Sequence, residues 1–250
     1  MKRNLSCLAM LTALTFNAAA AVLPSKVDFS HGMQDWEGGG AAAAISSGID
    51  SSLGNGTPSY HVQGDSNDFS LMSAGPAFSG NYTATKSFQF SLDITVAELA
   101  IGRSGGVPLT QDLILEFRDY DKPSQQERYS SVWYKLGAIG ADMPATQHFS
   151  VTVTDTSSNL LPPGWHGYGD LGPDGQDQLP YAQTFRRLLS DVDRIVVSTA
   201  VPGYVYGAVQ YYDVSVDNIA LAVPEPGNVS MLLAGLGLLC WVARRGRKNL

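Results

Sequence analysis

The stretch Phe88-Gln89-Phe90-Ser91-Leu92-Asp93-Ile94 alternates apolar and polar side chains without interruption. Because successive side chains of a strand point to opposite faces of a sheet, this alternation predicts a strand with one buried face and one solvated face. The same alternation returns, wholly or in part, at residues 113–117, 149–153 and 212–221. Glycine-rich and proline-rich stretches separate these segments and predict turns. The middle of the chain is therefore expected to consist of half-buried strands.

One segment has a helical spacing instead. Within residues 183–195, apolar side chains recur three or four positions apart behind Thr184, a residue type that caps helix N-termini. We expect a short amphipathic helix there, followed by a strand at residues 194–199. Many short strands, one helix and no regular exchange of strands with helices predict an all-β fold, an antiparallel jelly-roll-like β-sandwich.

The first 21 residues have the parts of a secretory signal peptide. Lys2 and Arg3 form a positive n-region, an apolar stretch follows, and a run of small residues ends at Ala20 and Ala21. Small residues after an apolar core are what a signal peptidase cleaves, so we expect residues 1–21 to be removed and the chain to be exported. An uncleaved N-terminal anchor is the alternative.

Residues 224–250 combine three elements against the end of the chain. Pro224, Glu225 and Pro226 come first, and they interrupt regular structure because proline lacks a backbone N–H and restrains the residue before it. Residues 229–243 carry no charge and predict a single hydrophobic transmembrane helix. Four basic side chains then close the chain: Arg244, Arg245, Arg247 and Lys248. At 1.5 Å per residue the helix spans about 22 Å, less than the hydrocarbon core of roughly 30 Å.

The order of these elements, opened by Val-Pro-Glu-Pro-Gly at 223–227, resembles the PEP-CTERM sorting signal of Gram-negative bacteria. The resemblance implies recognition in the inner membrane by exosortase, a protease-transpeptidase, followed by removal of the tail. It also implies delivery to the cell surface or to an extracellular polysaccharide matrix, as in a biofilm. A helix too short for a permanent anchor suits a temporary hold before cleavage. A plain C-terminal anchor and a buried helix of a soluble domain are the alternatives.

Residues 22–223 remain as one extracytoplasmic domain of ordinary size. Without the two ends, this domain keeps 10 Lys and Arg against 22 Asp and Glu, a net charge of −12. Such an acidic domain repels nucleic acid, so no nucleic-acid partner is expected, and it attracts cations such as calcium. Both cysteines, Cys7 and Cys240, lie in the end segments, so the domain must be stabilised by burial without a disulfide.

Several landmarks follow one another along the domain: Val27-Asp28-Phe29, Asp35-Trp36, and residues 76–80, 185–189 and 216–221. Their order resembles that of jelly-roll modules of the carbohydrate-binding and laminin domain IV type. In such modules a structural calcium ion often ties the first strand to the last through carboxylates. The resemblance implies Asp28 and Asp217 as the calcium ligands here. Ser30 departs from the pattern, because many carbohydrate-binding relatives have an acid at that place; simple surface carboxylates are the alternative.

The long turn-rich segment at 162–180 carries a candidate glycan-binding pair, Trp165 and Tyr168. Aromatic rings stack on the apolar faces of sugars, and their polar tips form hydrogen bonds, so these two side chains could form a platform for a sugar. The alternative places Trp165 at the edge of the core. Trp36 and Trp133 lie in or beside strand patterns and are expected in the core.

The same segment carries Asp170, Asp174 and Asp177 among glycines, which predicts either a solvated turn or a calcium site. The sequence has no metal-binding histidine spacing, no Gly-x-Ser-x-Gly elbow and no phosphate-binding loop. We therefore expect a non-catalytic exported surface or matrix protein that binds exopolysaccharide or serves as a structural part of a biofilm. The alternative is a secreted polysaccharide hydrolase whose acids come from these three aspartates and Glu127, since carboxylate pairs leave no local motif.

Overall fold

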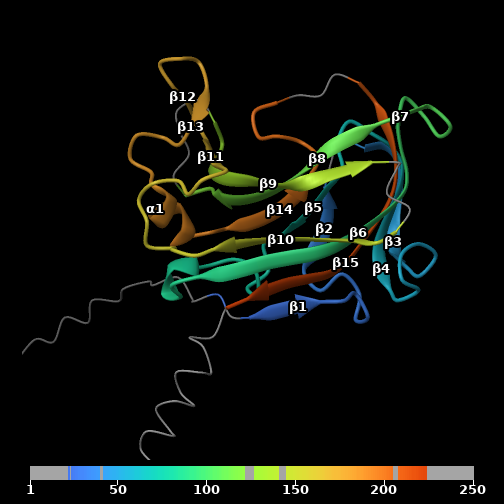
Figure 1. The fold of residues 1–250 in the computed structure, drawn as a ribbon, viewed down its shortest axis with the longest axis horizontal. Helices are drawn as coiled ribbons and strands as arrows, with labels where there is room; N and C mark the ends of the chain where they lie inside the picture. The colour runs from blue at the N-terminus through green and yellow to red at the C-terminus, as the bar shows by residue number, and fades with distance from the viewer. Residues whose placement is uncertain are drawn as a thin grey trace, which may run out of the picture.

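The computed structural model describes residues 22, 24–39, 42–121, 127–140, 145–204 and 208–223. The predicted signal peptide with its cleavage region, and the predicted tail at 224–250 with its hydrophobic helix, lie outside the described residues. Within the described part, antiparallel strands form a two-layer sandwich with one short α-helix (Figure 1). The prediction of an all-β sandwich with a single short helix is therefore confirmed.

The larger layer is a seven-stranded sheet. Its strands are β1 (Ser25–Val27), β3 (Ala42–Asp50), β4 (Ser59–Ser66), β6 (Phe88–Ile101), β7 (Val107–Pro108), β10 (Gln147–Val153) and β15 (Gln210–Ala222). The main path runs β10-β6-β15-β4-β3, with β1 added beside β15 and β7 beside β6. All three of the later alternating segments predicted from the sequence lie in strands, two of them in this sheet.

The second layer is a six-stranded sheet. Its strands are β2 (Trp36–Gly39), β5 (Ser70–Ser73), β8 (Thr110–Asp119), β9 (Ser130–Gly140), β11 (Trp165–Tyr168) and β14 (Arg194–Ser198). They are hydrogen-bonded in the order β11-β9-β8-β14-β5-β2. A separate hairpin of β12 (Asp170–Leu171) and β13 (Asp177–Gln178) projects from one end of the molecule (Figure 1).

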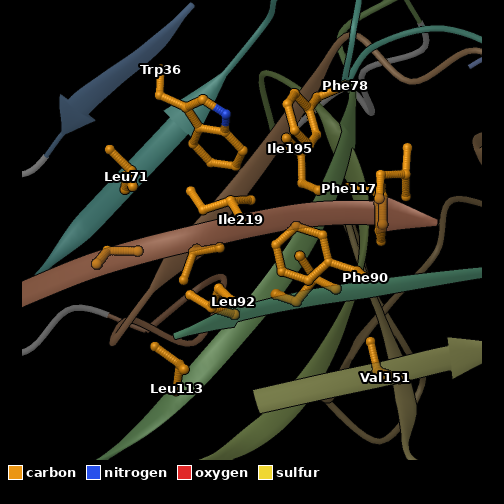
Figure 2. Packing of buried hydrophobic residues seen from close by; sticks show 14 of the residues in the cluster. Trp36, Leu71, Phe78, Phe90, Leu92, Leu113, Phe117, Val151, Ile195 and Ile219 are labelled. Carbon is orange, nitrogen blue, oxygen red and sulfur yellow. The ribbon is translucent and has the colours of Figure 1, made fainter. Parts of the chain in front are cut away.

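The core lies between the two sheets. In β6 the four apolar side chains of the stretch at 88–94 are at most 1% exposed, as the alternation predicts. They meet the alternate side chains of β8, so that Phe90 and Leu92 lie in one cluster with Leu113 and Phe117 (Figure 2). Each fully buried side chain of this size contributes roughly 1.5–3 kcal/mol. Burial between the layers is thus the main stabilising interaction of the domain.

The single α-helix, α1 (Phe185–Leu189), closes one end of the sandwich, where it packs against β8, β9 and the 3-10 turn η1 (Tyr82–Ala84). The Thr184 hydroxyl caps it by accepting a hydrogen bond from the Arg187 N–H at 3.2 Å. The helix ends at Ser190, so the prediction of a helix across 183–195 is wrong in extent. Val192 is buried instead through a β-bridge to Gly80, and β14 follows as predicted from Arg194.

Candidate functional site

The outer face of the six-stranded sheet carries a continuous row of side chains. In β8, Leu115 and Phe117 point into the core, so Glu116 between them points to the outer face. Strand register then places one residue of each neighbouring strand in line with Glu116. Across β11, β9, β8, β14, β5 and β2 this outer row consists of His166, Trp133, Glu116, Val196, Met72 and Glu37.

Glu116 is the central polar residue of the outer row. Its side chain is 1% exposed, and its Oε2 accepts hydrogen bonds from Arg118 Nε at 2.9 Å and Nη2 at 2.7 Å. Its other oxygen, Oε1, is buried and has no hydrogen-bond partner. Leaving a buried polar atom unsatisfied costs about 1–3 kcal/mol, and more for a charged group. This oxygen is therefore an acceptor that a ligand bearing a hydrogen-bond donor would satisfy.

The ion pair with Glu116 favours the charged form of Arg118. Burial alone would lower the pKa of Arg118, but the charge of Glu116 and its hydrogen bonds outweigh burial and raise that pKa. The Arg118 guanidinium lies 4.4 Å from the centre of the Tyr129 ring, a cation–π contact. Burial and the nearby Glu116 charge raise the pKa of Tyr129, so its hydroxyl stays neutral.

A cleft opens over this part of the sheet, with a volume of about 250 Å³. Its lining includes Asp68, Glu116, Arg118, Tyr129, Ser198 and Tyr204. The cleft is smaller than the roughly 300–1,000 Å³ typical of pockets for whole drug-sized ligands. Its size and polar lining suit one unit of an extended ligand better than a whole compact molecule.

An aromatic plate lies beside Glu116. The rings of Trp133 and His166 stack with their centroids 4.3 Å apart and an interplanar angle of 18°. His166 is exposed and Trp133 is partly exposed, on the strand next to Glu116. Side chains directly opposite each other in an antiparallel pair have Cβ atoms roughly 4.5–5.5 Å apart. The outer face thus combines a flat aromatic surface with a buried acceptor on adjacent strands.

The tryptophans do not all lie where the sequence predicts. Trp165 is 6% exposed and packs in the core against Phe117, Tyr134 and Phe185, with ring centroids 5.4–5.9 Å apart. Its prediction as a stacking platform is therefore wrong, and its alternative placement in the core is correct.

Trp133 is the opposite case. The prediction that it is buried in the core is wrong, because its neighbour Tyr134 takes the inward position in β9 and Trp133 faces outward. Alternation alone could not distinguish these two adjacent aromatic residues. Trp36, also expected in the core, is buried at 2% exposure.

Tyr168, the second predicted glycan contact, lies two positions after His166 on the same face of β11. It is 7% exposed, and its ring centroid lies 5.3 Å from that of Tyr129. Burial raises the pKa of Tyr168, and the neighbouring Glu127 acts in the same direction. Tyr168 therefore supports Tyr129, which lines the cleft, and its direct contact with a glycan stays a prediction.

The acidic residues of the long segment lie on the projecting hairpin. Asp170 accepts a hydrogen bond from the N–H of Leu171 at 2.9 Å, and Asp174 accepts one from Gln176 at 3.1 Å. Asp177 is exposed in β13. Hydrogen bonds of this local kind stabilise turns. These contacts agree with a solvated turn at Asp170 and Asp174, while Asp177 and Glu127 both lie near Tyr168.

The proposed calcium ligands lie on neighbouring strands, since Val27 of β1 pairs with Ile219 of β15. Asp28 accepts hydrogen bonds from Ser30, and Asp217 accepts them from Thr57 and Asn218. Across the described ranges, no group of three or more His, Cys, Asp or Glu side chains is arranged to hold a metal. The structural calcium at Asp28 and Asp217 stays a prediction.

The fold and the outer face together define an antiparallel β-sandwich with a polar, aromatic-flanked cleft. The chain also carries a PEP-CTERM protein-sorting motif, whose model matches residues 222–248. This motif indicates export and exosortase-dependent sorting to the cell surface, in agreement with the prediction from Pro224, Glu225 and Pro226. No helix within the described residues is long and apolar enough to span a membrane.

Comparison with solved structures finds carbohydrate-binding modules among the matches. The C-terminal family 22 carbohydrate-binding module of a Clostridium thermocellum protein matches with 11% identity and a TM-score of 0.41, covering 81% of this chain and 95% of that one. A xylan-binding domain from Paenibacillus barcinonensis matches with 11% identity and a TM-score of 0.38, covering 81% and 98%. An exo-β-agarase matches with 14% identity and a TM-score of 0.40 over 81% of this chain and 26% of its own. No curated protein sequence matches this chain.

Proposed function

We propose that this protein is a non-catalytic, exosortase-sorted protein of the cell surface or extracellular matrix whose sandwich binds polysaccharide through the outer face of the six-stranded sheet. The observation that carries this proposal is the unpartnered Oε1 of Glu116, buried in a polar cleft beside the Trp133–His166 plate. Sugars present hydroxyl donors around an apolar ring face. Such a ligand would satisfy Glu116 and cover the aromatic plate at the same time.

The ion pair with Arg118 favours binding over catalysis. A glycosidase requires one carboxylic acid that can give up a proton, and such an acid has a raised pKa. Glu116 Oε2 accepts two hydrogen bonds from the Arg118 guanidinium, an arrangement that suits a fixed acceptor. The aspartates named for the hydrolase alternative lie on the projecting hairpin, where Asp170 and Asp174 accept hydrogen bonds from its backbone.

The two ends of the chain support a role outside the cell. Signal peptidase would remove residues 1–21, and exosortase would act on the tail while residues 229–243 hold the chain in the inner membrane. The released domain is acidic, which favours solubility in an extracellular matrix. In this setting a glycan-binding domain would attach the protein to exopolysaccharide, as in a biofilm.

A glycan array probed with the purified protein tests the proposal, together with turnover assays on the same glycans. Binding without turnover is expected. Trp133→Ala should weaken binding by about 10-fold. This factor corresponds to a loss of roughly 1.4 kcal/mol in binding free energy, within the range for one aromatic contact. Tyr181→Ala is the matched control, because Tyr181 is a fully exposed aromatic residue outside the outer row. Binding that is unchanged in Trp133→Ala, or hydrolysis of a bound glycan, would overturn the proposal.

A further inference from the structure

The charges lining the cleft restrict the kind of glycan it accepts. Glu116 and Asp68 contribute two carboxylates, and Arg118 is the one cation among the described lining residues. Arg118 already directs Nε and Nη2 at Glu116 and lies against Tyr129. Arg194, the next cation on this face, does not line the cleft; it lies 3.7 Å from Glu37 and contacts the sulfur of Met72. Neither cation is directed at Glu116 Oε1, which the described lining therefore leaves as an acceptor for a ligand.

A uronic acid, sulfate or phosphate group does not fit this arrangement. Such groups bring hydrogen-bond acceptors and negative charge to a buried oxygen, Glu116 Oε1, that itself needs a donor. Two like charges at close range in a partly dry site repel each other strongly. The site thus selects for a ligand that donates hydrogen bonds, by a hydroxyl or by an ammonium group.

Three features favour the ammonium group over the hydroxyl. A hydrogen bond between charged groups contributes more to binding than a neutral one does. Trp133 stands opposite Glu116, and Tyr129 and Tyr204 line the cleft, so aromatic faces are available to a cation. The net charge of −12 on residues 22–223 also attracts a polycation and repels a polyanion.

We propose that the glycan bound in this cleft is a cationic amino-sugar polymer, a hexosamine chain that is at least partly without N-acetyl groups, with one ammonium group paired to Glu116 Oε1. This inference rests on the proposed polysaccharide-binding function and names its ligand class. The plate of Trp133 and His166 distinguishes a glycan from a basic peptide, because a flat aromatic surface beside the carboxylate matches a sugar ring.

Calorimetric titration of the full-length chain in detergent tests the inference. The ligands are a glucosamine hexamer, the N-acetylglucosamine hexamer of the same linkage, a galacturonate hexamer and hexalysine, at a pH below the pKa of the sugar amine. Binding of the glucosamine hexamer is expected to be about 10-fold tighter than that of its N-acetylated form, and the galacturonate hexamer should not bind. The preference should decrease as the pH rises through the pKa of the sugar amine.

Glu116→Gln should remove the 10-fold preference, because the amide keeps the shape of the side chain without its charge. Asp112→Asn is the matched control: Asp112 lies on the same strand but pairs with Lys135 at 2.6 Å outside the cleft, so the preference should persist.

Equal binding of both hexosamine hexamers would overturn this inference while leaving polysaccharide binding intact. Hexalysine binding as tightly as glucosamine would also overturn it, and failure of every glycan on the array would overturn both. The comparison of the two hexamers needs no variant, so it holds even if Glu116→Gln does not fold.

Discussion

His61 Nε2 lies 2.8 Å from Oδ1 of Asp213, a residue 152 positions further along the chain. The other ring nitrogen, Nδ1, lies 2.8 Å from Oδ2 of Asp50. A neutral imidazole has a single N–H, so both nitrogens can donate at once only when the ring is protonated. The three side chains, here called the His61 clamp, join β3, β4 and β15 on the outer face of the seven-stranded sheet.

The His61 clamp should make stability depend on pH. Burial alone would lower the pKa of His61, but hydrogen bonds to Asp213 and Asp50 and their charges outweigh burial and raise it. Because the pKa of His61 is higher in the folded protein than in the unfolded chain, protonation of His61 stabilises the fold. This stabilisation is complete below the pKa in the unfolded chain, about 6.5, and is lost as the pH rises through the pKa in the folded protein. The free energy of unfolding in urea should therefore decrease between about pH 6 and pH 8.

His61→Gln is the control for this dependence, since it removes the titrating group and keeps a polar side chain. The free energy of unfolding of the variant should decrease less over that pH range than that of the parent. The difference should be a few tenths to about 1 kcal/mol for each lost ion pair. The pKa of Asp50 is lowered, so its own contribution is lost only in acid, below the range measured. Equal pH dependence in parent and variant would contradict the clamp.

Arg118→Ala should be strongly destabilising. The substitution leaves the Glu116 carboxylate buried with neither oxygen paired, and removing one partner of a buried ion pair costs about 3–5 kcal/mol. Replacing both residues in Glu116→Gln/Arg118→Met should recover much of this loss, because no unpaired charge remains. Urea unfolding of the two variants measures both effects. A double variant as unstable as the single one would show that the charge is not the cause.

The two neighbouring tryptophans of the sheet should behave differently. Trp165→Ala removes a core side chain and should lower the free energy of unfolding by about 3–5 kcal/mol. Trp133→Ala removes a side chain from the outer face and should cost less stability, while it weakens glycan binding. Thermal unfolding and the glycan titration, run on both variants, separate the two roles. A larger stability loss in Trp133→Ala than in Trp165→Ala would contradict the assigned positions.

Replacement of Pro224, Glu225 and Pro226 with alanines should block sorting. The full-length form should then accumulate in the inner membrane, because the sorting motif at 222–248 would no longer open with its proline-bounded segment. Cell fractionation and the mass of the mature protein provide the measurement. Arg103→Ala, in a loop of the domain, serves as the control and should be processed normally. Unchanged processing of the triple-alanine variant would refute the role of this motif.

Much of the fold was predictable because alternation is a local property of the chain. The stretch at 88–94 indicated both a strand and its buried face, and β6 has the expected burial. The helix was predicted too long, because Val192 and Ile195 continue the helical spacing of the apolar residues. In the structure these two side chains are buried through β-pairing instead.

The candidate site was less predictable, because it depends on contacts between distant segments. Glu116 appeared in the sequence only as one polar residue of an alternating strand, and nothing local showed that it would be buried. Glu116 meets Arg118 and shares the lining of the cleft with Tyr129 and Tyr204, two residues that lie outside its strand. The adjacent aromatic residues Trp133 and Tyr134 were the one local signal of the site, because successive side chains of a strand face opposite sides and one of the two must face outward.

The sequence was sufficient to predict an all-β domain and to locate its sorting motif, because strand alternation and the motif at 222–248 are both patterns of consecutive residues. Only the folded structure shows which side chains meet on the outer face of the six-stranded sheet. Strand register places Trp133 opposite Glu116, and pairing of β4 with β15 brings Asp213 to His61. Alternation along one strand shows which of its faces is buried, but which residues of two distant strands stand opposite each other depends on the pairing of the strands in the folded sheet.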